Sequence, residues 1–212
     1  MEMGCRIGRI APMSGDLPQV TLIRHGETAW SLSGQATGRT DLALNEGGER
    51  EAQALSARLQ GLSFTTVLTS PLQRAQRTAE LAGFGELAVV DADLAEWDYG
   101  AYEGRRTADI RAVRAGWRLL EHGCPDGETL AAVSQRADRV IGRIRALGGD
   151  ALVFAHRDIL RVLAARWLNL HAVEARRLYL NTASVSILGY HHDLSEPVIR
   201  LWNSTEPRSL QK

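Results

Sequence analysis

The sequence predicts an α/β fold, a three-layer α/β/α sandwich with a mostly parallel central sheet. Short apolar, β-branched runs alternate with longer segments that have apolar residues at helical spacing. Several of the short runs end in polar or glycine-containing clusters, as buried strands do where they open into loops. Hydrophobic residues make up 44% and charged residues 24% of the chain, as in ordinary globular proteins. Strands that alternate with helices favour a parallel sheet covered on both faces.

Each element is predicted from its local sequence. Asn45 can cap a helix that buries an apolar face, and Ser70 with Pro71 predicts the first turn of a second helix. Gly148 ends the segment with the clearest helical spacing. The expected strands are 19–23, 65–69, 87–90, 151–154, 184–190 and 198–202, and the expected helices are 46–59, 70–82, 107–114, 129–147 and 159–168.

The 212 residues predict a single catalytic domain over 19–204, with a disordered leader over 1–18 and a short tail over 205–212. The leader contains charged residues and no apolar core segment, so it does not resemble a secretory signal. No stretch reaches the roughly 18 consecutive apolar residues of a membrane span. We therefore expect a cytoplasmic protein that binds no membrane.

The charge balance limits the classes of partner that the protein is expected to bind. Lys and Arg total 25 and Asp and Glu total 25, so the formal net charge is zero, and Lys212 is the one lysine among the cations. A neutral protein has no bulk field that attracts a polyanion, which argues against nucleic-acid binding. Only Cys5 and Cys124 are present, which excludes a disulfide framework and a cysteine-rich zinc site.

The chemistry is expected where the strands end, because ligands of such sheets bind outside the carboxyl ends of the strands. A neutral imidazole can attack a phosphoryl group while arginine forks hold its oxygens. A nearby carboxylic acid can protonate the leaving alkoxide and then activate water. None of these steps needs a metal or a cofactor. The residues that follow the expected strands are 24–26, 70–74, 91–96 and 156–157.

Four ordered motifs at these strand ends resemble the signatures of the histidine phosphatase superfamily, the phosphoglycerate-mutase-like group. The resemblance extends from Val20 to about Trp202. The motifs are LIRHGET at 22–28, SPLQRAQRTA at 70–79, LAEWDYGAYEG at 94–104 and FAH at 154–156, and TGRTDLAL at 37–44 looks like the loop before the family's first helix.

The resemblance assigns roles to named residues. It implies that His25 is the nucleophile that becomes phosphorylated and that Glu96 is the proton donor. By the same resemblance, Arg24, Arg74 and His156 hold the phosphoryl group.

The resemblance also implies contacts with the rest of the substrate. Thr37 and the backbone at Gly38 would contact it. Two positions depart from the family pattern: Arg157 follows His156 where glycine is usual, and Ser31 replaces a frequent asparagine. Ser31 has a shorter side chain that reaches less far, which would weaken one expected contact. Arg157 could narrow the pocket, add a phosphate contact or pair with Asp158.

Within the family, the aromatic-rich segment 98–104 is similar to the phosphatase branch. Segments 34–41, 96–100, 126–128 and 160–167 resemble sedoheptulose-1,7-bisphosphatase-type proteins in particular. Thr107 stands where a mutase typically has lysine. The expected function is metal-independent hydrolysis of a small phosphorylated metabolite, a sugar phosphate or bisphosphate. A mutase and a catalytically weak phosphate-binding protein remain alternatives. A second phosphate could be held by Arg39, Arg105 and Arg106.

Parts of the sequence also match other classes of phosphatase or metal site. Asp91 and Asp93 after an apolar strand allow a magnesium-dependent, haloacid-dehalogenase-type phosphatase, although the continuation of that motif is missing. A cysteine phosphatase is excluded because no arginine stands six residues after either cysteine. A metal site formed by His171, His191 and His192 is not favoured, since adjacent histidines on a strand would point to opposite faces.

Overall fold

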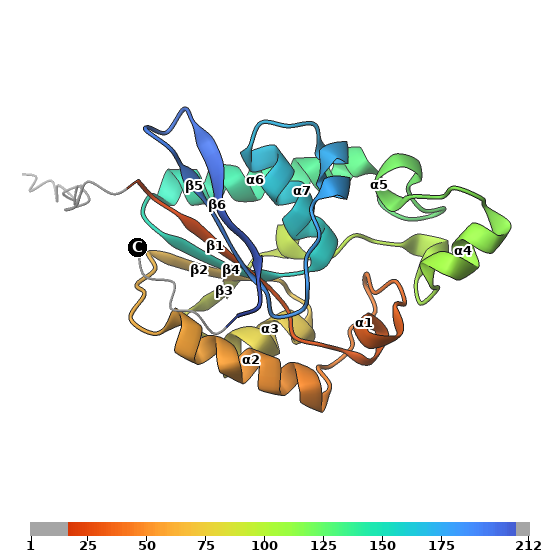
Figure 1. The fold of residues 1–212 in the computed structure, drawn as a ribbon, viewed down its shortest axis with the longest axis horizontal. Helices are drawn as coiled ribbons and strands as arrows, with labels where there is room; N and C mark the ends of the chain where they lie inside the picture. Colours follow the sequence, from red (N-terminus) through yellow and green to blue (C-terminus); the bar gives the residue numbers. More distant parts are fainter. Residues whose placement is uncertain (1–16, 207–212) are drawn as a thin grey trace, which may run out of the picture.

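The computed structural model describes residues 17–206, and a six-stranded sheet runs through its centre (Figure 1). The strand order is β3-β2-β4-β1-β5-β6; the first four strands in this order are parallel, and the last two add antiparallel pairs. The predicted, mostly parallel sheet is therefore confirmed. The strands are β1 (Val20–Arg24), β2 (Thr66–Thr69), β3 (Ala88–Val90), β4 (Ala151–Ala155), β5 (Val185–Tyr190) and β6 (Pro197–Ser204).

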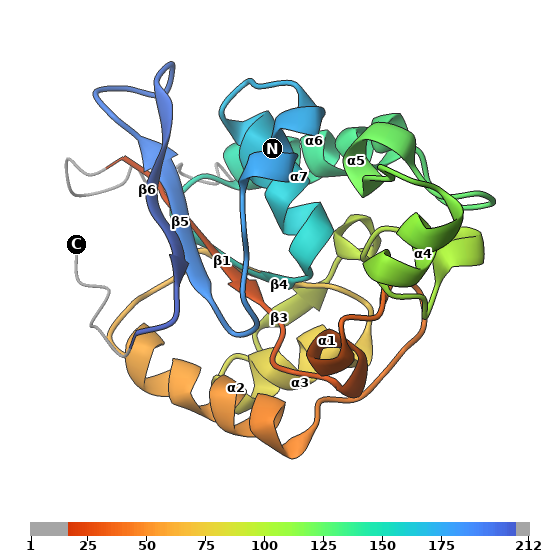
Figure 2. The ribbon, with the colours of Figure 1, turned by 45° about the vertical axis from the view of Figure 1, so that its right-hand side comes forward.

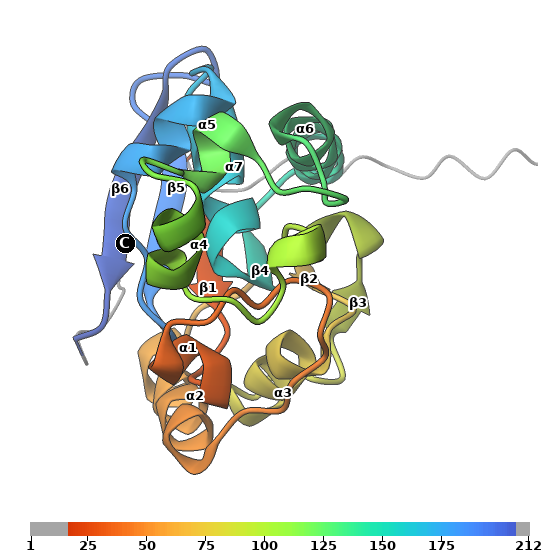
Figure 3. The same ribbon diagram turned by 90° about the vertical axis from the view of Figure 1, so that its right-hand side faces the viewer.

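Helices cover both faces of the sheet. Figure 3 shows α2 (Glu46–Leu59) and α3 (Gln73–Leu81) on one side, with α6 (Leu130–Leu147) and α7 (Arg157–Trp167) on the other. Each central strand contributes side chains to both helix–sheet interfaces, because successive side chains point to opposite faces of the sheet. On β1, for example, Leu22 joins the apolar cluster of the α6–α7 side and Ile23 joins that of the α2–α3 side. This is the predicted three-layer sandwich.

Smaller elements gather at the edge of the sheet where β1 ends. Figures 1 and 2 show α1 and α4 there, and Figure 1 shows α5 on the same side. They lie in the long connections that follow β1 and β3 and in the one between α7 and β5, and they form walls above the strand ends. These elements are α1 (Ala29–Ser33), α4 (Thr107–Val113), α5 (Leu119–His122), and the short 3₁₀ helices η1 (Ala92–Leu94), η2 (Gly100–Tyr102) and η3 (Ala172–Arg177).

The helix caps explain where the prediction from sequence was right and where it was wrong. Asn45 accepts from Gly48 N at 2.7 Å and begins α2 at the predicted residue. The predicted start at Ser70 was wrong: α3 begins at Gln73. The Ser70 hydroxyl is engaged instead with a buried histidine ring and with the backbone of the loop before α3.

Most of the predicted leader and tail, residues 1–16 and 207–212, lies outside the described residues. Leu17, the first described residue, packs against the main apolar cluster. None of the described helices is long and apolar enough to span a bilayer.

Candidate active site

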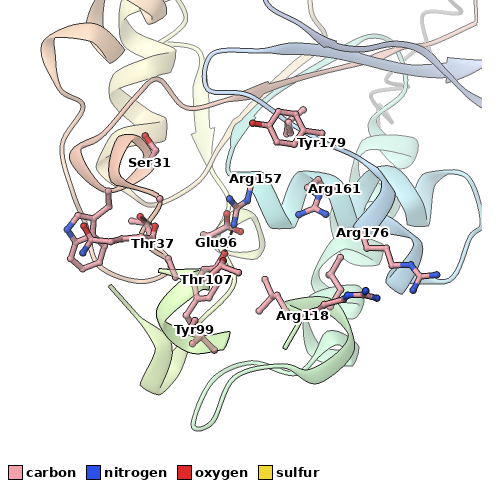
Figure 4. Close-up of a pocket in the computed structure, with 18 of the residues that line it drawn as sticks. Ser31, Thr37, Glu96, Tyr99, Thr107, Arg118, Arg157, Arg161, Arg176 and Tyr179 are labelled. Carbon is pink, nitrogen blue, oxygen red and sulfur yellow. Dashed lines mark hydrogen bonds between the residues drawn. The ribbon is translucent and has the colours of Figure 1, made fainter. Parts of the chain in front are cut away.

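A cavity of about 510 Å³ opens at the carboxyl end of β1 (Figure 4). Six of the nine residues predicted for the site line it, and three do not. Arg74 and His156 are completely buried beside His25, and Gly38 is buried in the loop that follows Thr37. The six lining residues are Arg24, His25, Ser31, Thr37, Glu96 and Arg157.

His25 is held in one tautomer. Its Nδ1 lies 2.7 Å from the carbonyl oxygen of Gly26, which can only accept, so Nδ1 carries the proton and Nε2 keeps a free lone pair. Burial, followed by the charges of Arg24 and Arg74, lowers the pKa of His25 well below its usual range. The ring is therefore neutral at pH 7, and its Nε2 can act as a nucleophile.

Two glycines allow the His25 loop to sit tightly on the start of α2. A Cβ on Gly26 would lie 2.3 Å from the carbonyl oxygen of Gly48, and a Cβ on Gly48 would lie 2.1 Å from that of Glu27. Either side chain would push the loop away from the helix. Gly26 N also donates to Thr78 Oγ1 at 3.0 Å, so α3 fixes the loop from a second side.

Arg74 reaches the site from α3 and is fixed by a histidine ring and two backbone carbonyls. Its Nε donates to His156 Nδ1 at 3.1 Å, its Nη1 to the Thr40 carbonyl at 2.9 Å, and its Nη2 to the Gly38 carbonyl at 2.9 Å. Because His156 Nδ1 accepts, its Nε2 carries the proton and donates to Ser70 Oγ at 2.6 Å. Burial and the charge of Arg74 keep the pKa of His156 low. His156 is therefore neutral and lies against the nucleophile, with ring centroids 5.1 Å apart.

Arg24 brings a second cation to the nucleophile. Its Nη1 donates to the Leu180 carbonyl at 2.7 Å, while its Nε is buried and has no hydrogen-bond partner within residues 17–206. Burial, and then the charge of Arg157, lowers the pKa of Arg24 to about 10, so it remains a cation at neutral pH. Its guanidinium thus retains an unused donor beside His25.

Glu96 lies under α7, with 3% of its surface exposed. Its Oε1 accepts from Trp97 N at 2.9 Å and Ile159 N at 3.0 Å, and its Oε2 accepts from Asp158 N at 3.0 Å. Burial and the charge of Asp158 raise the pKa of Glu96, although the backbone hydrogen bonds oppose the increase. Glu96 therefore holds a proton more readily than a surface glutamate does.

Arg157, whose side chain is partly exposed, belongs to a network built on the buried carboxylate of Asp158 beside Glu96. Its Nη2 donates to Asp158 Oδ2 at 3.1 Å and to the Tyr99 hydroxyl at 3.2 Å, and Tyr99 donates in turn to Asp158. Arg161 donates to Asp158 Oδ1 at 2.7 Å. Burial opposes ionisation of Asp158, but the two arginines hold its pKa well below the usual range. This network directs the Arg157 side chain toward Glu96 in the cavity (Figure 4).

Of the other three residues predicted to contact the substrate, two line the cavity and one is bonded to a neighbouring side chain. Gly38 N is occupied by Glu103 Oε1 at 2.8 Å, so this backbone group secures the loop. The Ser31 hydroxyl lines the cavity while it donates to the Thr28 carbonyl at 3.0 Å. Thr37 lines the cavity, and its hydroxyl donates to the Gln35 carbonyl at 3.3 Å.

The arginines expected to hold a second phosphate do not line this cavity. Arg39 lies 3.7 Å from Glu128, and the Arg105 guanidinium lies over the Tyr102 ring at 5.4 Å. Prediction from sequence missed four arginines that do line the cavity. None of them follows a strand, so no strand-end pattern could have found them. They are Arg111, Arg118, Arg161 and Arg176.

Asp91 and Asp93 do not line the cavity; both pair with arginines of α6. Arg143 contacts Asp91 at 2.6 Å and Asp93 at 2.8 Å, and Arg139 contacts Asp93 at 2.5 Å, all from α6. Cys124 is partly buried, and burial raises the pKa of its thiol to about 12, so it is not a reactive thiolate. Neither the aspartate nor the cysteine alternative gains support.

The expected orientation of His191 and His192 was wrong. Strand β5 ends at Tyr190, so both histidines lie in a turn, with ring centroids 3.8 Å apart. Both approach Glu196 Oε2, at 3.5 and 2.8 Å. Within residues 17–206, these three exposed side chains are the one group with spacing suited to a metal ion; His171 is not among them.

The fold and this strand-end site define a phosphoryl-transfer enzyme of the α/β/α type. The sequence pattern of the histidine phosphatase superfamily (branch 1) matches residues 20–205, and the chain belongs to this family. Its relatives include named phosphatases, and the chain is accordingly a histidine phosphatase.

Individual relatives include named phosphatases and also a probable phosphoglycerate mutase GpmB of Cronobacter sakazakii, which is 36% identical over 81% of this chain and 85% of its own length. An acid phosphatase of Mycobacterium tuberculosis is 38% identical over 84% of this chain and 89% of its own length. Sedoheptulose 1,7-bisphosphatase of Saccharomyces cerevisiae is 31% identical over 87% and 92%. The solved structure of an open reading frame from Mycobacterium tuberculosis superposes with a TM-score of 0.83 at 36% identity, covering 88% of this chain and 97% of that one.

Proposed function

We propose that the protein hydrolyses small phosphomonoesters, without a metal, through a phosphohistidine formed on His25. The observation that supports this most directly is the state of the His25 ring: neutral, protonated at Nδ1 and near the charges of Arg24 and Arg74. An imidazole of this kind is a nucleophile, and two guanidiniums beside it can offset the charge of a phosphoryl group in transfer.

The reaction has two steps. In the first, His25 Nε2 forms a bond to phosphorus while the bond from phosphorus to the ester oxygen breaks. Glu96 gives its proton to that oxygen, and the alcohol leaves. In the second step, Glu96 takes a proton from water, the water oxygen attacks phosphorus, and the N–P bond breaks to release phosphate. Each group ends as it began, as a catalyst requires.

The proposed substrate class is sugar phosphates or bisphosphates, which places the reaction in carbohydrate metabolism. A cavity of about 510 Å³ is within the roughly 300–1,000 Å³ typical of sites for small organic ligands. A similarity to a protein named sedoheptulose 1,7-bisphosphatase points to the same class. Thr107 lines the cavity where a mutase typically has lysine, which favours transfer to water over transfer to a second substrate oxygen.

Phosphoenzyme labelling tests the proposal. The protein should take up an acid-labile, base-stable phosphoryl group from a radiolabelled small phosphodonor, and His25→Ala should abolish both the label and phosphate release. EDTA should leave turnover unchanged. Label that persists in His25→Ala would contradict the nucleophile assignment, and loss of turnover in EDTA would favour a metal-dependent mechanism. A label that forms but is never hydrolysed would indicate a phosphate-binding member of the family.

A further inference from the structure

Although the whole chain is neutral, its cavity is strongly cationic. Six arginines line it against two glutamates, Glu96 and Glu121. One phosphoryl group at His25 can engage the cations nearest the nucleophile. The remaining arginines belong to α4, α7 and η3 or directly precede α5, and these elements lie beyond the strand ends. The six are Arg24, Arg111, Arg118, Arg157, Arg161 and Arg176.

Two of these arginines converge on one carboxylate oxygen at the outer end of the cavity. Arg118 Nη1 lies 3.2 Å from Glu121 Oε1, and Arg176 Nη1 lies 2.8 Å from the same atom. Figure 4 shows the Arg118 and Arg176 side chains side by side, on the opposite side of Glu96 from Ser31 and Thr37. Two guanidiniums therefore already hold an anionic oxygen there.

The other cavity arginines are fixed by different partners. Arg157 and Arg161 share the buried carboxylate of Asp158, and Arg111 donates to the Trp117 carbonyl at 3.0 Å. The Arg118 and Arg176 side chains are 62% and 38% exposed, and their shared partner Glu121 is 25% exposed, whereas Asp158 is fully buried, so this pair can exchange its partner for a ligand. Leu119 and Leu120 also line the cavity beside this pair and give the uncharged part of a ligand an apolar surface.

We propose that Arg118 and Arg176 form a distal anion site, which binds a second anionic group on the alcohol part of the substrate. The inference rests on the proposed function, since the first phosphoryl group is placed at His25. Glu121 occupies this distal site in the absence of substrate, and a phosphate dianion offers more charge and more acceptor oxygens to the same guanidiniums. The preferred substrate class is therefore bisphosphates of small sugars.

The test compares substrates with and without the second anion. Initial rates are measured with fructose 1,6-bisphosphate, with its two monophosphates and with 4-nitrophenyl phosphate. The double variant Arg118→Gln/Arg176→Gln should raise the KM for the bisphosphate about 10- to 100-fold, the loss expected for one or two charge-assisted hydrogen bonds. Its KM for 4-nitrophenyl phosphate should change less than about twofold, because that ester has no second anion to contact the pair. Arg50→Gln, which removes an exposed arginine that pairs with Glu46, is the matched control.

A second variant tests the role of Glu121. Glu121→Gln should lower the KM for the bisphosphate and leave that for 4-nitrophenyl phosphate unchanged, because the internal competitor loses its charge. Equal changes for both substrates, or no change in either variant, would overturn the distal site while leaving the proposed function intact.

Binding without turnover separates the two proposals. Calorimetry on His25→Ala should show that fructose 1,6-bisphosphate binds more tightly than either monophosphate, and that the arginine double variant removes the difference. This result would support the distal site even if hydrolysis through His25 were disproved. Equal affinities for the bisphosphate and the monophosphates would overturn the distal site.

Discussion

The Nε of Arg74 donates to Nδ1 of His156 at 3.1 Å, and this bond links the second and fourth strand-end motifs, across 82 residues of sequence. It requires an unprotonated Nδ1 on His156, which leaves the other ring nitrogen to donate to Ser70. A cation is thereby fixed against the nucleophile by contacts that come from α3, β4 and the loop after β2. The phosphoryl-binding end of the cavity is thus preorganised by side chains that are themselves held.

Arg74→Lys should be strongly damaging although it conserves the charge. Lysine has no planar fork, so it cannot contact His156 and the Thr40 and Gly38 carbonyls together. We expect kcat for 4-nitrophenyl phosphate to fall about 100-fold or more, as for the loss of an electrostatic contact to a reacting group. The matched control is Arg77→Lys, an exposed arginine of the same helix, which should retain normal kcat. Normal turnover in Arg74→Lys would show that the fork is dispensable.

Glu96→Gln should separate substrates by their leaving groups. A poor alkoxide leaving group needs the Glu96 proton, whereas a nitrophenolate does not. We expect kcat/KM for a sugar phosphate to fall about 100-fold or more and that for 4-nitrophenyl phosphate to fall less than about tenfold. Steady-state kinetics on both substrates measure the difference. Parallel losses would argue that Glu96 does not donate the proton.

The pH profile should have an acidic optimum on sugar phosphates. His25 must be neutral, and because burial and its neighbouring arginines lower its pKa, activity falls only at pH values well below 6.5. Glu96 must be protonated, and because burial and Asp158 raise its pKa, activity on sugar phosphates declines only above that raised value. The decline at high pH should weaken with 4-nitrophenyl phosphate. Equal declines for both substrates would assign the alkaline limb to another group.

Asp158→Asn should destabilise the fold more than removal of a surface carboxylate. Asp158 is buried and pairs with both Arg157 and Arg161, so the change leaves two cations without their counter-charge. We expect the free energy of unfolding to fall by about 3 kcal/mol, measured by urea denaturation. Asp138→Asn, which removes a partly exposed pair with Arg166, should cost less than about 1 kcal/mol. Similar losses in the two variants would show that the buried network adds no stability.

The core of the site was predictable because its residues stand at the ends of strands or within a few residues of them. The positions of His25, Arg74 and His156 follow from short local patterns, since parallel strands place their carboxyl ends at one edge of a sheet. Helices α2 and α6 were predicted with their caps for the same local reason. The resemblance to a family supplied the roles, which the positions alone do not assign.

The part of the cavity lined by Arg118 and Arg176 was not predictable from such local patterns. Arg118 and Arg176 are far apart in the sequence and meet only because α5 packs against η3. The same holds for the Arg157 network, whose tyrosine partner comes from a separate loop. Ser70 was expected to cap a helix, and a contact with His156 across 86 residues, invisible in the local sequence, directs it elsewhere. Long-range packing decides all three.

The three N–H groups around Glu96 have a consequence for the direction of proton transfer. They donate to its oxygens from the backbone, two of them at the start of α7, where the helix dipole favours negative charge. When Glu96 releases its proton, the new carboxylate therefore forms in surroundings already arranged to solvate it. Because this solvation comes from the main chain, most side-chain substitutions at Trp97, Asp158 or Ile159 would preserve it, and a proline at one of these positions would remove one of its donors.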